Sequence, residues 1–164
     1  MSELAIVNAS PLVFLGNAGR LELLRAVGTS RIVVPQAVFD EVTSSKHCDR
    51  ASASVKEAKW LERSAVSAIP TSVGAWDLGS GESEVIAIGL LNRHARLVID
   101  DLAGRKCGLS HGLDVIGTLG VVIAAHRRGM VEDPAAVFAE LRAAGMWLSD
   151  ALLARVLKQA TGSE

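Results

Sequence analysis

The sequence GESEVIAIGLLNRHARLVIDD, residues 81–101, contains the pattern that decides the fold. It predicts a helix over residues 82–93, followed by a short apolar strand at Leu97–Ile99. A strand that is apolar on both faces is typical of a parallel sheet covered by helices on its two sides. We therefore expect an α/β protein.

Acidic residues lie at both ends of this stretch. Glu82 and Glu84 fall in the first turn of the helix, and Asp100 and Asp101 directly follow the strand. Ligands of α/β proteins bind beyond the carboxyl ends of the strands. Carboxylates gathered there repel one another, and Mg²⁺ or Mn²⁺, which prefer oxygen ligands, would relieve the repulsion. The pattern predicts a metal-dependent acidic site.

Each acidic pair also has a purely structural interpretation. Acidic residues in the first turn of a helix stabilise its dipole. An aspartate after a strand can form an Asx turn or cap the following helix. Both interpretations stay open at the level of sequence.

Strands and helices alternate along the rest of the chain. We predict further strands at Leu4–Val7, Arg31–Val34, Ala65–Ile69 and Leu113–Ile116. Helices are predicted after Ser10-Pro11 and after Pro35, and over residues 51–63, 102–109, 117–128, 134–144 and 149–160. This order predicts a three-layer α/β/α sandwich with a mostly parallel central sheet.

The 164 residues suit a single domain over 1–164. Its core is expected at about 4–145, with C-terminal helices within 134–160 that pack on the core or on a second subunit. No stretch has the length or apolarity of a transmembrane helix, and the N-terminus lacks the pattern of a signal peptide. We expect no membrane association.

The net charge of −1 and the two cysteines set further bounds. Without the five acidic candidates of the site (Glu41, Glu82, Glu84, Asp100 and Asp101) the charge becomes +4, which suits a phosphodiester substrate. Two cysteines without a CxxC motif predict a protein of the reducing cytoplasm without a disulfide framework.

Five residues outside the acidic pairs complete the candidate site. Asn8 ends the first strand, and Glu41 lies in the helix that Pro35 begins. Ser10 and Thr118 start helices that follow strands, so each could contact a ligand or cap its helix. Arg105 lies one turn beyond Asp101 and is a candidate phosphate contact.

Other chemistries find less support. The pairs His47-Cys48 and Cys107-x-x-x-His111 could in principle form a zinc site, although the first lacks the usual spacing. No nucleophilic triad or phosphate-binding loop is present in the sequence. The three tryptophans, at 60, 76 and 147, are isolated, and we expect them to pack or to line a rim.

Five segments together resemble the PIN-domain superfamily. They are VNASPLVFL, VVPQAVFDEV, GESEVIAIGL, LVIDDLAGRKCG and LDVIGTLGVVIAAHRRG, and the resemblance extends over about residues 4–145. The subgroup that they resemble most includes VapC-type toxin ribonucleases. The resemblance implies an α/β/α sandwich whose carboxylates bind Mg²⁺ or Mn²⁺ and cleave RNA, often as a homodimer.

The resemblance also assigns residues to the site. The acidic positions of the family fall on Asn8, on Glu41, on Glu82 or Glu84, and on Asp100 with Asp101. Asn8 departs from the pattern, because most active PIN nucleases have aspartate there. The resemblance therefore implies a metal-dependent ribonuclease acting on single-stranded RNA, the toxin of a pair with a cognate antitoxin.

Two other classes of function remain open. The first is a catalytically weak or inactive PIN-like domain that binds RNA or a partner protein, which Asn8 and the near-neutral charge favour. The second is a receiver-like phospho-acceptor, suggested by the aspartate pair after an apolar strand.

Overall fold

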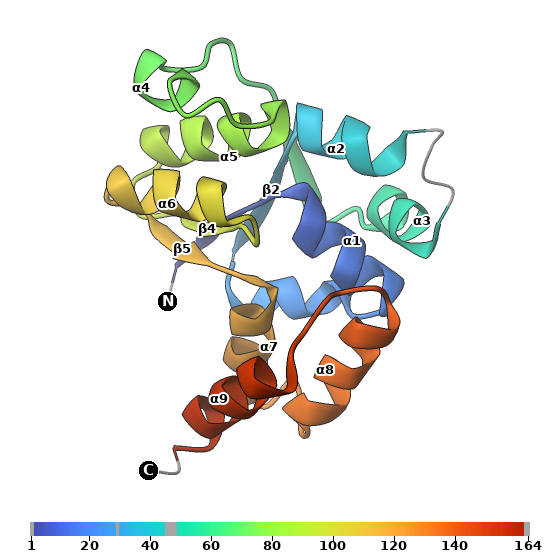
Figure 1. The fold of residues 1–164 in the computed structure, drawn as a ribbon. Coiled ribbons are helices and arrows are strands. Elements are labelled where there is room, and N and C mark those ends of the chain that lie inside the picture. The colour runs from blue at the N-terminus through green and yellow to red at the C-terminus, as the bar shows by residue number, and fades with distance from the viewer. Residues whose placement is uncertain (1, 29, 45–48, 163–164) are drawn as a thin grey trace.

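The computed structural model describes residues 2–28, 30–44 and 49–162, and these residues form a five-stranded sheet (Figure 1). The strands are β1 (Leu4–Val7), β2 (Arg31–Pro35), β3 (Leu61–Ser64), β4 (Arg96–Val98) and β5 (Asp114–Ile116). Their order is β3-β2-β1-β4-β5, and every neighbouring pair is parallel. The predicted parallel sheet is confirmed.

Helices cover both faces of this sheet, as expected for a three-layer α/β/α sandwich. On one face α5 (Ser80–Leu91) packs against β1, β2 and β4, and α6 (Leu102–Ser110) packs against β5. On the other face lie α1 (Ala9–Asn17), the 3₁₀ helix η1 (Leu21–Ala26) and α7 (Thr118–Arg127) (Figure 1). The remaining helices are α2 (Gln36–Thr43), α3 (Arg50–Glu57), α4 (Thr71–Gly74), α8 (Pro134–Ala143) and α9 (Asp150–Thr161).

The strand order places a switch point between β1 and β4. The chain proceeds from β1 through β2 to β3 in one direction and from β4 to β5 in the other. Ligands of open α/β sheets bind at such a point, beyond the carboxyl ends of the strands. The order also differs from the 2-1-3-4-5 order of receiver-type folds, so the receiver-like interpretation is wrong.

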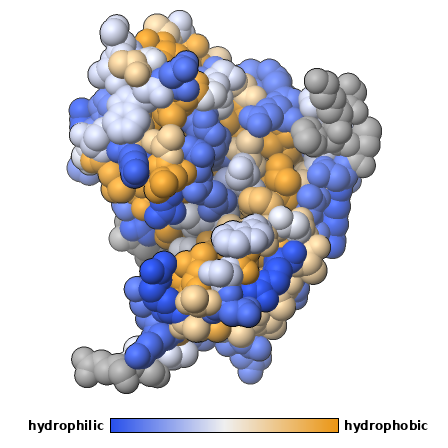
Figure 2. Space-filling view, viewed as in Figure 1, coloured by the Kyte–Doolittle hydropathy of each residue, from blue (hydrophilic) through white to orange (hydrophobic). Residues whose placement is uncertain are grey.

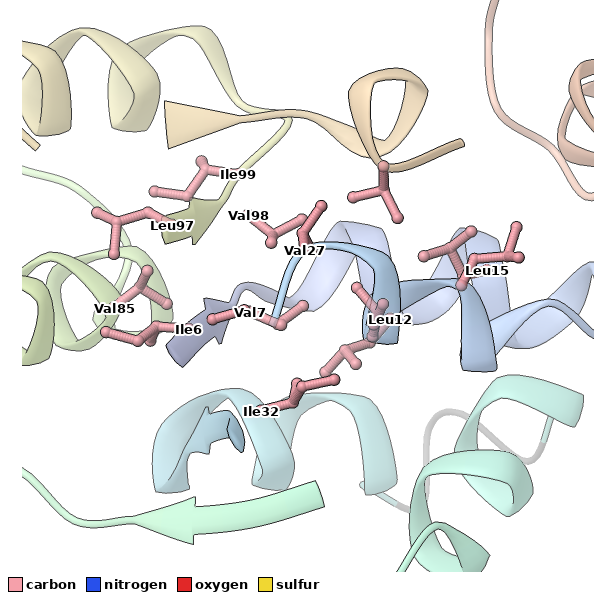
Figure 3. Packing of buried hydrophobic residues seen from close by; sticks show 14 of the residues in the cluster. Ile6, Val7, Leu12, Leu15, Val27, Ile32, Val85, Leu97, Val98 and Ile99 are labelled. Carbon is pink, nitrogen blue, oxygen red and sulfur yellow. The ribbon is translucent and has the colours of Figure 1, made fainter. Parts of the chain in front are cut away.

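The two strands beside the switch point form the centre of the hydrophobic core. Ile6 on β1 pairs with Val33 on β2 and with Leu97 on β4, and its side chain is fully buried. Leu12 and Leu15 of α1 are fully buried in the same cluster (Figure 3). Burial of each such side chain contributes about 1.5–3 kcal/mol. This packing fixes the strand ends from which the candidate site is built.

The region after α3 differs from the prediction. The helix predicted over residues 51–63 ends at Glu57, and residues 61–64 form the edge strand β3; the strand predicted at Ala65–Ile69 is absent among the described residues. Tertiary contacts explain β3, because Arg31 of β2 donates to Glu62 at 2.7 Å. The guanidinium of Arg63 lies 3.7 Å from the centre of the Phe39 ring.

Two helix starts also differ by one or two residues from the prediction. Helix α1 begins at Ala9 with Asn8 in the N-cap position, so Ser10 lies inside the first turn and does not cap the helix. Helix α5 begins at Ser80, with Gly79 preceding it. Within the described ranges, no helix has the length and apolarity needed to cross a membrane.

Candidate active site

Asn8 occupies the carboxyl end of β1 at the switch point. Its side chain forms no hydrogen bond with the helix that it precedes, and the residue is only 3% exposed. The carboxamide instead faces α5, where Nδ2 donates to Glu82 Oε1 at 3.5 Å. Its backbone N–H donates to Val98 O at 3.0 Å, which joins Asn8 to the end of β4.

Gly81, in the first turn of α5, lies next to the side chains of both Asn8 and Glu41. A Cβ atom at this position would lie 3.4 Å from Asn8 Oδ1 and 3.4 Å from Glu41 Oε2. It would also lie 3.0 Å from Val38 Cγ2, tighter than most real contacts. Glycine therefore leaves a small space toward which two oxygen atoms from β1 and α2 converge.

The two glutamates of α5 form hydrogen bonds with different parts of the structure. Glu82 reaches Asn8 through Oε1, while its Oε2 accepts from the Gly79 N–H at 2.9 Å. Glu84 accepts from the Ala37 N–H at 3.0 Å and so caps the start of α2. Residues two apart on a helix do not share a face, which explains the division. The structure brings Glu82, and not Glu84, beside Asn8.

Asp100 lies after β4 and is held by the start of α7. Its Oδ1 accepts from the Thr118 N–H at 2.7 Å, and its Oδ2 accepts from the Thr118 hydroxyl at 2.6 Å. Thr118 is fully buried. Its hydroxyl therefore orients Asp100 and has no surface through which to reach a ligand.

Asp101 caps α6, as the structural interpretation of the sequence anticipated. Its Oδ2 accepts from the Gly104 N–H at 2.9 Å. A Cβ atom on Gly104 would lie 3.5 Å from Glu82 Cγ and 3.7 Å from Asp101 Oδ2, so both acidic side chains lie against this glycine. Among the acidic candidates, Asp101 is thus near Glu82.

Arg105, one turn into α6, lies beside Asp100. A Cβ atom on Gly117 would lie 2.5 Å from Arg105 Nη1 and 3.0 Å from Asp100 Oδ1, so both side chains lie against this glycine in their present positions. Arg105 Nη1 also donates to the Ile99 carbonyl at 3.4 Å. Ser10 is half-buried on α1, and its hydroxyl has no hydrogen-bond partner within the described residues.

A family model described as a PIN domain matches residues 4–162. The chain belongs to the PIN-domain family. Its fold is similar to that of a PilT N-terminus domain protein from the hyperthermophilic archaeon Sulfolobus solfataricus P2, with a TM-score of 0.50. The two share 17% sequence identity, over 89% of this chain and 97% of that one. No curated protein matches the sequence significantly. The resemblance to the PIN-domain superfamily inferred from the sequence is confirmed.

The candidate ligand atoms of this PIN domain are oxygens, which are of the chemical type that binds a hard divalent cation. Amide and carboxylate oxygens are the ligands that Mg²⁺ and Mn²⁺ prefer. Within the described ranges no three His, Cys, Asp or Glu side chains form a ready metal-binding group. Four of the carboxylates instead accept backbone N–H groups at helix starts, and Asn8 Oδ1 and Glu41 Oε2 face the space above Gly81.

The zinc alternative has only half of its ligands in the described residues, because His47 and Cys48 lie outside them. Cys107 is buried, and its Sγ lies 3.9 Å from Nδ1 of His111. Burial raises the pKa of the Cys107 thiol, which disfavours the thiolate that zinc requires. The same His111 Nδ1 lies 2.8 Å from the Cys107 carbonyl oxygen, an ordinary helix-end contact.

Sequence reasoning missed the two glycines that shape this PIN-domain site. Gly81 and Gly117 leave the spaces that Asn8, Glu41, Asp100 and Arg105 face. Each glycine stands at a helix start, where a turn or a cap explains it equally well. The sequence contains no signal that would have separated these roles.

Proposed function

We propose that this PIN domain is a ribonuclease that uses Mg²⁺ or Mn²⁺ to hydrolyse phosphodiester bonds in single-stranded RNA. The observation that carries the proposal is the convergence of Asn8 Oδ1 and Glu41 Oε2 on the space above Gly81, with Glu82 beside them. This convergence lies at the switch point of the sheet, where α/β proteins bind ligands.

Asn8, Glu41 and Glu82 would hold the cation, and Asp100 and Asp101 would assist directly or through water. Glu84 is assigned a structural role, because its carboxylate caps α2. When bound, the cation would lower the pKa of a water molecule and stabilise the leaving oxygen. No serine, cysteine or histidine is needed as a nucleophile.

The remaining residues position charge around the reacting phosphate. The Thr118 hydroxyl holds Asp100 at 2.6 Å and so fixes the orientation of that carboxylate. Arg105 and Asp100 both lie against Gly117, and Arg105 would supply positive charge toward a phosphate. A preformed positive group of this kind stabilises negative charge in the transition state without reorganisation.

A specific observation favours a second candidate, a catalytically silent domain that binds RNA or a partner protein. The amide of Asn8 donates to Glu82, a contact that an aspartate could not make while charged. The carboxylate of Glu82 therefore has a hydrogen-bond donor in the site without a bound cation. Under this candidate the protein binds RNA with little or no turnover.

The biological setting is proposed from the family resemblance alone. We propose a cytoplasmic homodimer that acts as the toxin of a toxin–antitoxin pair. A cognate antitoxin would bind over the acidic site and block access of RNA to it.

Cleavage of a labelled pool of single-stranded RNA tests the proposal. We expect cleavage with Mn²⁺ or Mg²⁺ that is lost in EDTA and in Asp100→Asn. Folded wild-type protein that cleaves no faster than Asp100→Asn in the presence of metal would overturn the enzymatic proposal. RNA binding retained in that case would support the silent candidate.

A further inference from the structure

A groove of about 620 Å³ is lined by Asp100 and, among the described residues, does not include Asn8. One wall consists of α6, β5 and α7, and the other consists of residues 146–148 and α9. In Figure 2 the surface is hollowed between α4–α6 above and α7–α9 below, with hydrophobic residues gathered beside the hollow. A chain bound at the candidate site would continue into this groove.

Trp147 stands at the rim of the groove with 86% of its surface exposed. Of the two positions expected for the tryptophans, packed or at a rim, Trp147 takes the rim. Its neighbours hold it in place: Leu148 is buried, and its carbonyl accepts from Arg142 Nη2 at 2.7 Å. The N–H of Met146 donates to the Leu141 carbonyl at 3.0 Å. An indole ring presented on an anchored segment is a suitable stacking platform.

The charges along the groove favour a polyanion. Arg105 and Arg127 both line it, and in the described part of the chain neither has a carboxylate within 4 Å. Arg127 Nη2 donates to the Gln159 carbonyl at 3.3 Å. Arg96 also lines the groove, but Asp114 neutralises it at 2.6 Å. Against these charges, Asp100 is the one carboxylate among the described residues that line the groove.

The walls between the charges are apolar. Leu102 lines the groove and is 65% exposed, and Leu119 and Ile123 of α7 lie opposite the α9 side chains. Alternating cationic and aromatic or apolar surface is the pattern that binds single-stranded nucleic acid, because phosphates need positive charge and bases need flat apolar contacts.

We infer that this groove binds the nucleotide adjacent to the scissile phosphate, with its base stacked on Trp147 and its phosphate paired with Arg127. The inference rests on the proposed function, since it extends the RNA path from the candidate metal site. The occupant is single-stranded RNA. A protein segment or a second copy of this chain on the same surface is an outcome that the test distinguishes.

Binding without cleavage provides the test. Fluorescence anisotropy of the full chain in EDTA would use a fluorescein-labelled single-stranded RNA of about 12 nucleotides, within the range that such surfaces cover. We expect Trp147→Ala to weaken binding roughly 5- to 150-fold, the range of one base–aromatic stack, and Trp147→Phe to retain most of the affinity. The matched control is Trp76→Ala, which removes a partly exposed tryptophan outside the groove and should leave the affinity unchanged.

Charge is tested by a second matched pair. Arg127→Gln should weaken binding and lower the slope of log affinity against log salt by about 0.7, the value for one phosphate contact on a single strand. Arg155→Gln removes the same charge from an exposed position of α9 outside the groove and should change the slope little. With an oligomer lacking bases, Trp147→Ala should lose its effect while Arg127→Gln keeps its own.

Three results would overturn the inference. The first is wild-type protein that binds no RNA in EDTA. The second is equal affinity of Trp147→Ala and Trp76→Ala. The third is a change in the oligomeric state of Trp147→Ala, measured by sedimentation, with no change in its affinity for RNA. That result would show that the surface contacts a protein. Metal-dependent cleavage is measured separately, so failure of this inference and failure of the proposed function remain distinguishable.

Discussion

Replacing Asn8 by aspartate should destabilise the metal-free protein and make its stability depend on Mn²⁺. Asn8 Nδ2 lies 3.5 Å from Glu82 Oε1, so the substitution replaces a donor by a carboxylate oxygen at that distance. Two like charges so placed repel by about 1 kcal/mol in bulk water and about 5 kcal/mol at an effective dielectric constant of 20. Because Asn8 is 3% exposed, the larger value is the better guide.

Protonation limits this penalty. Holding an aspartate neutral at pH 7 costs about 4 kcal/mol, since its ordinary pKa is about 3.9 and each pKa unit is worth about 1.4 kcal/mol. We therefore expect Asn8→Asp to lose about 1–4 kcal/mol of unfolding free energy at pH 7 in EDTA. The loss should shrink as the pH falls toward 4, because protonation removes the repulsion.

Urea unfolding in EDTA and in Mn²⁺ measures both effects. Mn²⁺ at 100 times its Kd should return about 2.7 kcal/mol to Asn8→Asp. Asn17→Asp is a matched control, because Asn17 Nδ2 donates to Asp49 Oδ2 at 3.2 Å, away from the site. That variant should lose stability without recovery in Mn²⁺. Equal stability of Asn8→Asp and wild type in EDTA, or equal Mn²⁺ responses of the two variants, would refute the reasoning.

Three substitutions test contacts of Thr118, Glu140 and Cys107. Thr118→Val should lower the free energy of unfolding, measured by urea denaturation, by about 1.5–3 kcal/mol, because it leaves the Asp100 carboxylate without its hydroxyl donor. An unchanged free energy of unfolding would contradict the role of Thr118 in positioning Asp100. Arg20 lowers the pKa of Glu140, and the two half-exposed side chains form an ion pair that stabilises the fold by about 0.2–1 kcal/mol. This stabilisation is present above the pKa of glutamate in the unfolded chain. It is lost as the pH falls through the lower pKa of Glu140 in the folded protein. Glu140→Gln should therefore be less stable than wild type at pH 7 by an amount that shrinks as the pH falls, and a difference that grows in acid would contradict the assignment. Burial raises the pKa of the Cys107 thiol. In a variant in which Cys48 is replaced by serine, Cys107 should therefore react with a disulfide reagent far more slowly in native buffer than in urea. Equal rates would show that the thiol is accessible in the folded protein.

Much of the fold was predictable from local sequence. Strand β1 and the apolar strand before Asp100 follow from continuous hydrophobic runs, and the helix after Pro35 follows from the fixed φ of proline at its start. Strand β3 was not predictable, because Leu61–Ser64 contains only one apolar residue, and pairing with β2 creates it.

The candidate site was predictable as a set of residues but not as a geometry. The spacing of Glu82 and Glu84 placed them on different faces of one helix, yet only the position of α2 decides which of them meets Asn8. The partner of Asp100 is Thr118, eighteen residues later, and that contact depends on how β4 and β5 pair. Long-range contacts of this kind leave no local signal in a single sequence.

The most direct measurement of the central claim is the rate of single-turnover RNA cleavage in Mn²⁺ by Glu82→Gln compared with Glu84→Gln. Both variants remove one negative charge from the first turns of α5, but only Glu82 lies beside Asn8. We expect Glu82→Gln to abolish most of the wild-type rate, and Glu84→Gln to retain it with some loss of stability, because the amide oxygen can still cap α2. Equal rates for the two variants, or a larger loss in Glu84→Gln, would contradict the proposed site.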